Sequence, residues 1–378
     1  MAEFINEISK TFDEFILLPN LTEEHHTVDR VSLVTPVAKY GSQLGFGSAH
    51  GNEWLIKEGK NLKIPLVTAA MQSVSGVETS VALAKEGGMA FIYCSQSPES
   101  QARMVHEVKE HQTKEQHLMV GAAVNTRDYE DRIPKLVAAG VDVLCMDSSD
   151  GYSVYQKKVL DYVRKNFGKT VKIGAGNVVS ADAFDYLVKN GADFIKVGIG
   201  GGSICITRKE KAIGCGQATA VRDVVNARDK HFEETGVYIP VCSDGGVSHD
   251  NQIIMAMAFG ADFVMMGKYF ARFKEAPGEL VDKNGQKFKE YWGEGSNRAK
   301  NWQRYESDGK QVFEEGVNGL VPFVGNLADT VQQTTLKLKS TMCNLGALNL
   351  REFTKKARIM PLSGMGVLEG SASVMINQ

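Results

Sequence analysis

The chain has 378 residues, which is enough for one large barrel or for two domains of average size. A hydrophobic content of 43% is ordinary for a globular protein, and a formal net charge of −2 gives no basic field that would attract nucleic acid or an acidic membrane. The N-terminus lacks the basic and apolar regions of a secretory signal, and no apolar run approaches the ~18 residues of a membrane-spanning helix. Six cysteines without metal-ligand spacing predict a disulfide-free cytoplasmic protein.

A short segment recurs along the chain. It consists of a glycine followed by an apolar run, and in three of the four copies an aspartate stands two residues after the glycine. Residues 139–146, 190–197 and 259–266 are similar copies, and residues 86–93 are a looser one. The glycine lies where a residue that ends a helix is expected. The apolar run, without polar alternation, is typical of a parallel strand buried on both faces.

In chain order, the predicted strands are residues 64–71, 89–94, 118–124, 141–147, 171–175, 193–198, 239–244 and 262–267. Most intervals between them hold an amphipathic helical segment, such as residues 97–110 and 181–190. Eight units of strand followed by helix predict an α/β fold of the (β/α)8 TIM-barrel type, with residues 1–378 as one catalytic domain. An open, doubly wound sheet is the alternative.

Polar residues follow the ends of the predicted strands, where TIM barrels carry their active sites. These segments are Met71-Gln-Ser73, Ser95-Gln96, Asn125-Thr-Arg127, Asp147-Ser-Ser-Asp150, Gly176-Asn177, the loop with Cys205, Ser243-Asp-Gly-Gly246 and Gly267-Lys-Tyr269. Each alone is also typical of a helix cap or a turn. Their convergence on one rim favours a functional site.

The loop after the sixth predicted strand reads Gly198-Ile-Gly-Gly-Gly-Ser-Ile-Cys-Ile-Thr-Arg208. Glycines let a backbone turn its N–H groups toward an anion or its carbonyls toward a cation. The loop then presents Cys205 close to a hydroxyl and a guanidinium group, which is typical of an activated nucleophile. A buried structural cysteine in a tight turn is the alternative for such a residue taken alone.

A long polar excursion follows the eighth predicted strand, at about residues 271–316. It contains Tyr291-Trp-Gly-Glu-Gly295 and Asn301-Trp-Gln-Arg-Tyr305. Connections of this length are more often functional than idle, so we interpret the segment as a flap over the site.

Five motifs carry a family resemblance: Gly200-Gly-Gly-Ser-Ile-Cys-Ile-Thr-Arg208, Asp147-Ser-Ser-Asp150, Cys242-Ser-Asp-Gly-Gly246, Ala69-Ala-Met-Gln-Ser73 and Asn301-Trp-Gln-Arg-Tyr305. Over nearly its whole length the chain resembles the superfamily of inosine 5′-monophosphate (IMP) dehydrogenases and guanosine 5′-monophosphate (GMP) reductases. The Asp-Ser-Ser segment and the Arg-Tyr pair resemble the dehydrogenase branch.

This resemblance implies a catalytic mechanism. Cys205 would attack C2 of the hypoxanthine ring of IMP, and hydride would pass from that carbon to NAD. The covalent thioimidate on Cys205 would then be hydrolysed to xanthosine 5′-monophosphate (XMP), as a step in guanine nucleotide biosynthesis. Arg304 and Tyr305 on the flap match the family's water-activating pair. Thr207 would position the water, and Glu315 would relay a proton.

The resemblance also implies ligand sites. For the purine nucleotide these are Met71 and Glu294 at the base, Asp244 at the ribose, and Ser203, Gly246, Gly267 and Tyr291 at the phosphate. For NAD they are Arg127, Asp147, Ser148 and Gly198. A potassium ion would take backbone carbonyls of Gly200, Gly202 and Cys205, together with Glu369, Gly370 and Ser371 of a neighbouring subunit, which implies a homotetramer.

One feature of the sequence leaves an alternative to the dehydrogenase assignment. Family members often carry a paired regulatory module of the CBS type after the second strand, and here only the residues around 106–117 occupy that place. GMP reductases typically lack that module too, so NADPH-dependent deamination of GMP to IMP is the alternative activity. Arg304 and Tyr305 favour the dehydrogenase, because a reductase needs no attacking water. A purine-nucleotide-binding regulatory protein without catalysis is the alternative of another class.

Overall fold

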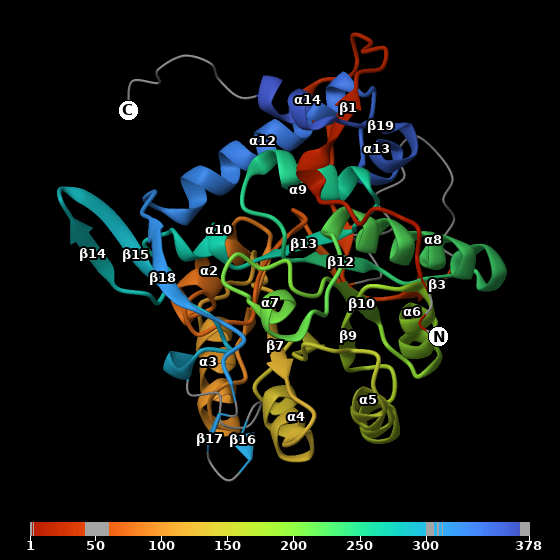
Figure 1. Ribbon diagram of the computed structural model, residues 1–378. Helices are drawn as coiled ribbons and strands as arrows, with labels where there is room; N and C mark the ends of the chain where they lie inside the picture. The colour runs from red at the N-terminus through yellow and green to blue at the C-terminus, as the bar shows by residue number, and fades with distance from the viewer. Residues whose placement is uncertain are drawn as a thin grey trace.

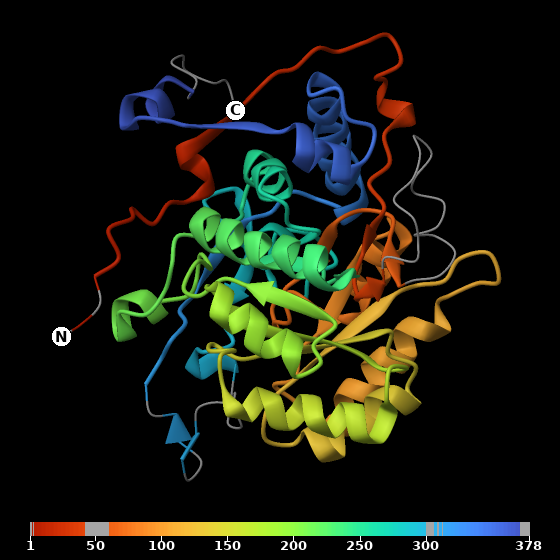
Figure 2. The ribbon, with the colours of Figure 1, turned by 90° about the vertical axis from the view of Figure 1, so that its right-hand side faces the viewer.

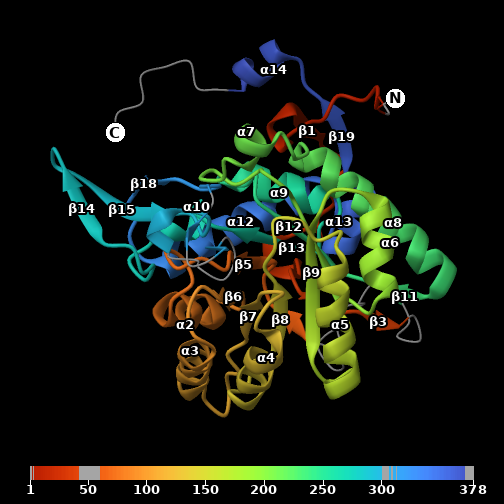
Figure 3. The same ribbon diagram turned by 60° about the horizontal axis from the view of Figure 1, so that its bottom comes forward.

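The computed structural model describes residues 2, 4–41, 60–299, 306–307, 310–311 and 313–370. Eight parallel strands close into a barrel in the order β10-β12-β13-β5-β6-β7-β8-β9. They are β5 (Leu66–Thr68), β6 (Met89–Ile92), β7 (Val120–Val124), β8 (Val143–Met146), β9 (Lys172–Val178), β10 (Phe194–Val197), β12 (Val241–Asp244) and β13 (Phe263–Met266). The strands lie in the centre of the molecule with helices around them (Figures 1 and 3). The predicted TIM barrel is confirmed.

All eight predicted strands are present, but each differs from the prediction at one end or both, and the largest differences are in β5 and β9. The predicted strand 64–71 is shorter, because the backbone turns where the Met71 N–H donates to the Ala69 carbonyl at 2.8 Å. The predicted strand 171–175 is too short, because β9 continues to Val178. Asn177, expected after the strand, lies within it, and its side-chain amide donates to the Gly198 carbonyl at 2.7 Å.

The barrel interior is filled by side chains that alternate along the strands. Phe91, Phe194 and Phe263 belong to the interior cluster, with ring centroids 6.2 Å apart for the first pair and 5.4 Å for the second. Gly121 and Gly174 make room for these rings, since a Cβ atom there would lie 2.4 Å from a Phe91 carbon and 2.0 Å from a Phe194 carbon. The barrel is therefore a packed core and not a pore.

Helices surround the barrel on the outside (Figure 1). They are α2 (Val77–Lys85), α3 (Pro98–Glu110), α4 (Tyr129–Ala138), α5 (Val154–Phe167), α6 (Ala181–Lys189), α7 (Thr207–Lys211), α8 (Gln217–Thr235), α9 (Asp250–Ala258), α10 (Lys268–Ala271), α12 (Leu327–Asn344), α13 (Leu350–Lys356) and α14 (Gly364–Glu369). Four of them end at the glycines of the sequence repeat, which have positive φ: Gly87, Gly140, Gly191 and Gly260. The expected helix-ending role of these glycines is confirmed.

The aspartates of the repeat share one environment at the amino end of the barrel. Asp142 accepts the Val120 N–H at 2.9 Å, Asp193 the Ile173 N–H at 2.8 Å and Asp262 the Val241 N–H at 2.7 Å. Each also pairs with a cation: Lys109 for Asp142 at 2.5 Å, Arg164 for Asp193 at 2.5 Å and Arg228 for Asp262 at 3.0 Å. Each aspartate thus ties its own strand to the start of the preceding barrel strand.

The remaining strands form small antiparallel sheets around the barrel. These strands are β1 (Phe15–Leu18) with β19 (Arg358–Pro361), β2 (Thr35–Pro36) with β4 (Asn61–Leu62), β3 (Tyr40–Gly41) with β11 (Val237–Tyr238), and β16 (Glu306–Ser307) with β17 (Lys310–Gln311). Short 3-10 helices are η1 (Phe12–Glu14), η2 (Val28–Arg30) and η3 (Asn297–Ala299). The N-terminal segment passes beside the C-terminal helices (Figure 2), where the Ser32 N–H donates to the Leu348 carbonyl at 2.8 Å.

The excursion after the eighth strand is more ordered than its polar composition suggests. Strands β14 (Leu280–Lys283), β15 (Gln286–Trp292) and β18 (Asn318–Pro322) form a three-stranded antiparallel sheet that projects from the barrel (Figure 1). Alternation along β15 buries Lys289 and Tyr291. After α3, residues 111–119 lead directly to β7, so no further module stands at that point. Across the described part of the chain, no helix has both the length and the apolar character to cross a bilayer.

Candidate active site

A cavity opens at the carboxyl ends of the barrel strands. Its lining combines strand ends, the cysteine loop and the flap, and includes Met71, Asp147, Ser148, Asn177, Lys196, Gly198, Gly200, Gly202, Cys205, Thr207, Asp244, Tyr291, Glu294 and Glu315. Of the predicted strand-end segments, those with Met71, Asp147, Asn177, Cys205 and Asp244 contribute to this lining, whereas Ser95-Gln96, Asn125-Thr-Arg127 and Gly267-Lys-Tyr269 do not.

The cysteine loop leaves β10 with a backbone that only glycine accommodates well. Gly198 has φ of +137°, and a Cβ atom there would lie 2.0 Å from the Asp244 carbonyl oxygen. The loop therefore packs directly against the end of β12. It closes with the Cys205 N–H donating to the Gly202 carbonyl at 3.1 Å, and the Cys205 side chain is exposed in the cavity.

Cys205, Thr207 and Glu315 form a continuous hydrogen-bonded chain. The Cys205 thiol donates to Thr207 Oγ1 at 3.1 Å, and the Thr207 hydroxyl donates to Glu315 Oε2 at 2.8 Å. Thr207 and Glu315 are buried, and Lys211 Nζ lies 3.5 Å from Glu315 Oε1. This arrangement offers a path for a proton between the exposed thiol and a buried carboxylate.

Backbone hydrogen bonds hold the end of the flap, at residues 315–317, against the cysteine loop. The Ile206 N–H donates to the Glu315 carbonyl at 3.0 Å, and the Val317 N–H donates to the Ile204 carbonyl at 3.1 Å. Cys205 and Gly316 form an antiparallel bridge between these two bonds. The end of the excursion thus lies against the cysteine loop. Arg304 and Tyr305 lie outside the described residues.

Asp244 lies over a buried ammonium group. Lys196 Nζ is 2.9 Å from Asp244 Oδ2 and also donates to Asn177 Oδ1, while Asn177 Nδ2 donates to Asp244 Oδ2 at 2.9 Å. Burial alone would lower the pKa of Lys196, but the Asp244 carboxylate raises that pKa above its usual value. Both bonds use Oδ2, so among the described residues these contacts leave Oδ1 for a ligand.

Sequence reasoning missed Lys196. The available signal was a lysine in the apolar strand Phe194–Val197, where a charged side chain needs a buried partner. The partner Asp244 is 48 residues away, so the pairing depends on the closed barrel.

Of the four residues expected at a phosphate group, Tyr291 lines the cavity, and Ser203 and Gly267 lie beside it. Burial raises the pKa of Tyr291, whose hydroxyl hydrogen-bonds Ser203. A Cβ atom at Gly267 would lie 2.5 Å from the Tyr291 hydroxyl oxygen, so glycine allows this approach. The Gly246 N–H already donates to the Gly201 carbonyl at 2.8 Å, so the two loops must separate before that N–H donates to a ligand.

The residues expected at the base, Met71 and Glu294, both line the cavity. Glu294 is buried and accepts the Gln72 N–H at 2.6 Å and the Ser95 hydroxyl. Gln72 in turn accepts from the Trp292 indole N–H at 3.2 Å. These bonds tie the flap to the ends of β5 and β6.

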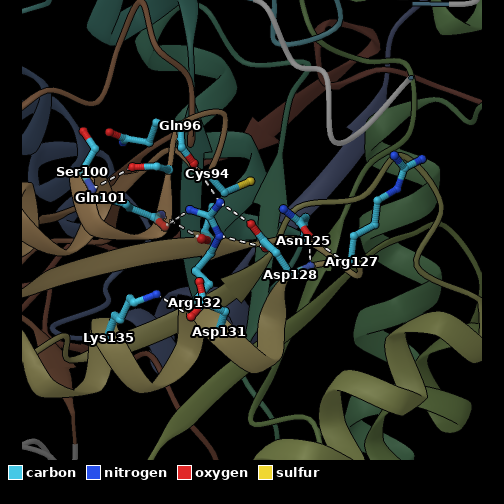
Figure 4. Close-up of polar contacts among 12 residues, drawn as sticks. Cys94, Gln96, Ser100, Gln101, Asn125, Arg127, Asp128, Asp131, Arg132 and Lys135 are labelled. Carbon is cyan, nitrogen blue, oxygen red and sulfur yellow. Dashed lines mark hydrogen bonds and ion pairs between the residues drawn. The ribbon is translucent and has the colours of Figure 1, made fainter. Parts of the chain in front are cut away.

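Three of the four residues expected at NAD line the cavity, namely Asp147, Ser148 and Gly198. Their carboxylate, hydroxyl and backbone groups suit the hydroxyls and amide of a dinucleotide. Arg127 is not part of the lining, and its side chain points away from Asp128 and its neighbours (Figure 4). The Arg127 N–H donates to Asn125 Oδ1 at 2.7 Å, which fixes the loop that carries it.

The residues expected at potassium are not assembled within one chain. Gly200, Gly202 and Cys205 line the cavity, whereas Glu369 and Gly370 lie at the end of α14 and do not. Ser371 lies outside the described residues. Backbone oxygens suit a hard cation, and the Gly202 carbonyl keeps a second lone pair beside its bond to Cys205. The described residues contain no cluster of His, Cys, Asp and Glu side chains that could hold a metal ion.

Comparison with known proteins assigns the family. Residues 9–373 match the IMP dehydrogenase / GMP reductase domain. The chain is 41% identical to an inosine-5'-monophosphate dehydrogenase of Tritrichomonas foetus, over all of this chain and 98% of that protein. It is 30% identical to the enzyme of the same name from Borreliella burgdorferi, over 93% of this chain and 98% of the relative. The chain therefore belongs to the IMP dehydrogenase / GMP reductase family.

Proposed function

We propose that this protein oxidises IMP to XMP with NAD as the hydride acceptor, in guanine nucleotide synthesis. The observation that carries the proposal is the hydrogen-bonded chain Cys205–Thr207–Glu315, which joins an exposed thiol to a hydroxyl and a buried carboxylate in the cavity at the carboxyl ends of the barrel strands. The names of the relatives support the same reaction.

The proposed chemistry has two halves. In the first, the Cys205 sulfur bonds to C2 of the purine, and C2 releases its hydride to the nicotinamide ring. In the second, water adds to C2, the C2–sulfur bond breaks, and XMP leaves with a regenerated thiol. The balance is one IMP, one NAD and one water converted to XMP, reduced NAD and one proton.

Thr207 and Glu315 serve the second half in this proposal. Thr207 accepts a hydrogen bond from the thiol and donates one to Glu315, so it can orient a water at the carbon bonded to sulfur. Glu315 then relays the proton of that water. Arg304 and Tyr305 remain predicted as the groups that activate the water.

The remaining residues bind and orient in this proposal. Asp244 accepts hydrogen bonds from ribose hydroxyls, and the buried Lys196 holds its carboxylate in place. Asp147 and Ser148 would hold NAD, which supplies hydride-accepting chemistry when bound. A potassium ion on the cysteine loop, a homotetramer that completes its site and a cytoplasmic location belong to the same proposal.

The test follows the absorbance of reduced nicotinamide with two reactant pairs, IMP plus NAD and GMP plus NADPH, each with and without potassium. We expect a rise with the first pair that is abolished by Cys205→Ala. Cys215→Ala is the matched control, because Cys215 lies outside the cavity lining. A fall with only the second pair would establish GMP reductase activity, and silence with both would favour a regulatory protein without catalysis.

A further inference from the structure

A fully buried arginine lies outside the cavity, behind the ends of two barrel strands. Arg132 on α4 has no exposed surface. Its guanidinium donates from Nε to Asp128 Oδ1 at 3.0 Å and from Nη2 to Asp128 Oδ2 at 2.6 Å. It also donates to Gln101 Oε1 at 2.6 Å and to the Gln96 carbonyl at 2.8 Å (Figure 4).

These contacts join the loop after β6 to the loop after β7. Gln96 belongs to the first loop, and Asp128 follows the second. Gln101 extends the link, because its side-chain amide donates to the last residue of β6, Ile92, at 2.9 Å and to Ala123 of β7 at 2.8 Å. One guanidinium therefore sets the spacing of two neighbouring rim loops.

Each loop carries a group of the proposed site. In the first, the Ser95 hydroxyl donates to Glu294. The second carries Arg127, and Asn125 Oδ1 accepts the N–H groups of Arg127 and Asp128 at 2.7 and 3.1 Å. A shift of Asp128 therefore moves the backbone from which Arg127 projects.

Arginine suits this place for a geometric reason. A buried charge is costly unless its partners satisfy it, and the planar guanidinium donates to four acceptor atoms on three residues. A lysine would keep the charge but could not hold the carboxylate and both loops in the same arrangement. When groups that orient a ligand are displaced from such a fixed arrangement, their interaction with the ligand weakens.

We infer that Arg132, through its pair with Asp128, is a positioning residue for the NAD half of the cavity. The inference rests on the proposed function. The guanidinium bonds described above go to Asp128, Gln101 and Gln96, none of which is assigned to the phosphate or ribose of the nucleotide. Glu294 at the base has a bond from the Gln72 N–H that does not depend on Ser95. Loss of Arg132 therefore weakens NAD binding more than capture of IMP by Cys205.

The test compares Arg132→Lys with Arg228→Lys. Arg228 is the matched control, since it is also buried and paired with an aspartate, but at the amino end of the barrel. We expect Arg132→Lys to raise the KM for NAD about tenfold and to leave the KM for IMP within about threefold. Adduct formation at Cys205 with a halogenated purine nucleotide should persist. Arg228→Lys should lower the Tm and change neither KM.

A lower Tm with an unchanged KM for NAD in Arg132→Lys would overturn the inference and leave Arg132 a structural residue. If Arg132→Lys does not fold, Asp128→Asn gives the second measurement, because the amide oxygen still accepts one guanidinium bond. An unchanged KM for NAD in that variant would also overturn it. Inactivity of the unchanged protein with IMP and NAD would instead overturn the proposed function.

Discussion

Carboxylates stand at both ends of this barrel, and their partners differ. At the amino end, Asp142, Asp193 and Asp262 each accept a backbone N–H of the neighbouring strand and pair with a cation. At the carboxyl end, Glu315 accepts from a hydroxyl that is itself bonded to an exposed thiol. The repeated aspartate arrangement at the amino end stabilises the strands. At the carboxyl end, where TIM barrels carry their active sites, the carboxylate has different partners around a cavity.

Lys196 and Asp244 stand between these two cases. The Lys196 side chain is as buried as the cations that pair with aspartates at the amino end of the barrel. Both Lys196 and Asp244 nevertheless line the cavity. A buried ion pair alone is therefore no sign of a purely structural residue. The predictions below separate the two ends by measuring activity and stability in the same variants.

Thr207→Val should have the largest effect on activity. It removes the hydroxyl that joins Cys205 to Glu315, and we expect kcat to fall about a hundredfold, within the range of general acid–base contributions. Thr334→Val is the control, because the buried Thr334 likewise joins a hydroxyl, of Tyr269 at 2.6 Å, to a carboxylate, of Asp250 at 2.8 Å. Equal kcat losses in the two variants would contradict the assignment.

Asp193→Asn should have the largest effect on stability. It leaves Arg164 and Lys39 near a neutral amide, and breaking a buried pair costs about 3–5 kcal/mol. We expect a lower midpoint in denaturant, with kcat per folded protein unchanged. A loss of kcat with an unchanged midpoint would show that the amino end takes part in the reaction.

The effect of pH on stability should be smaller and should depend on Asp142. Burial alone would raise the pKa of Asp142, but Lys109 and Lys60 lower it below the usual 3.8. The resulting stabilisation is therefore full above pH 3.8 and is lost as the pH falls through the lowered pKa. The Tm difference between Asp142→Asn and the unchanged protein should narrow toward low pH. A Tm difference that stays constant with pH would contradict stabilisation by the Asp142 ion pairs.

The fold could be predicted from the sequence because its signals are local. The repeated glycine and the apolar run each act within a few residues, so all eight barrel strands were found. The prediction of Cys205 and Thr207 as site residues has the same origin, since both follow one glycine-rich strand end. The predicted end of β9 was wrong because backbone pairing with β10 continues past a register shift to Val178.

The missed features depend on contacts between distant segments. Lys196 pairs with Asp244 only across the closed barrel. The three-stranded sheet of the excursion could not be predicted because β18 pairs with β15 across residues 293–317. Likewise, the position of Arg132 in α4 gives no hint that its side chain joins two rim loops.

The most direct test of the central claim is a mass measurement on protein quenched during turnover with IMP and NAD, followed by peptide mapping. The account predicts an added purine nucleotide on the peptide that contains Cys205, and its absence in Cys205→Ala. Product formation without any adduct, or an adduct that maps to Cys94 or Cys215, would contradict the proposed role of Cys205.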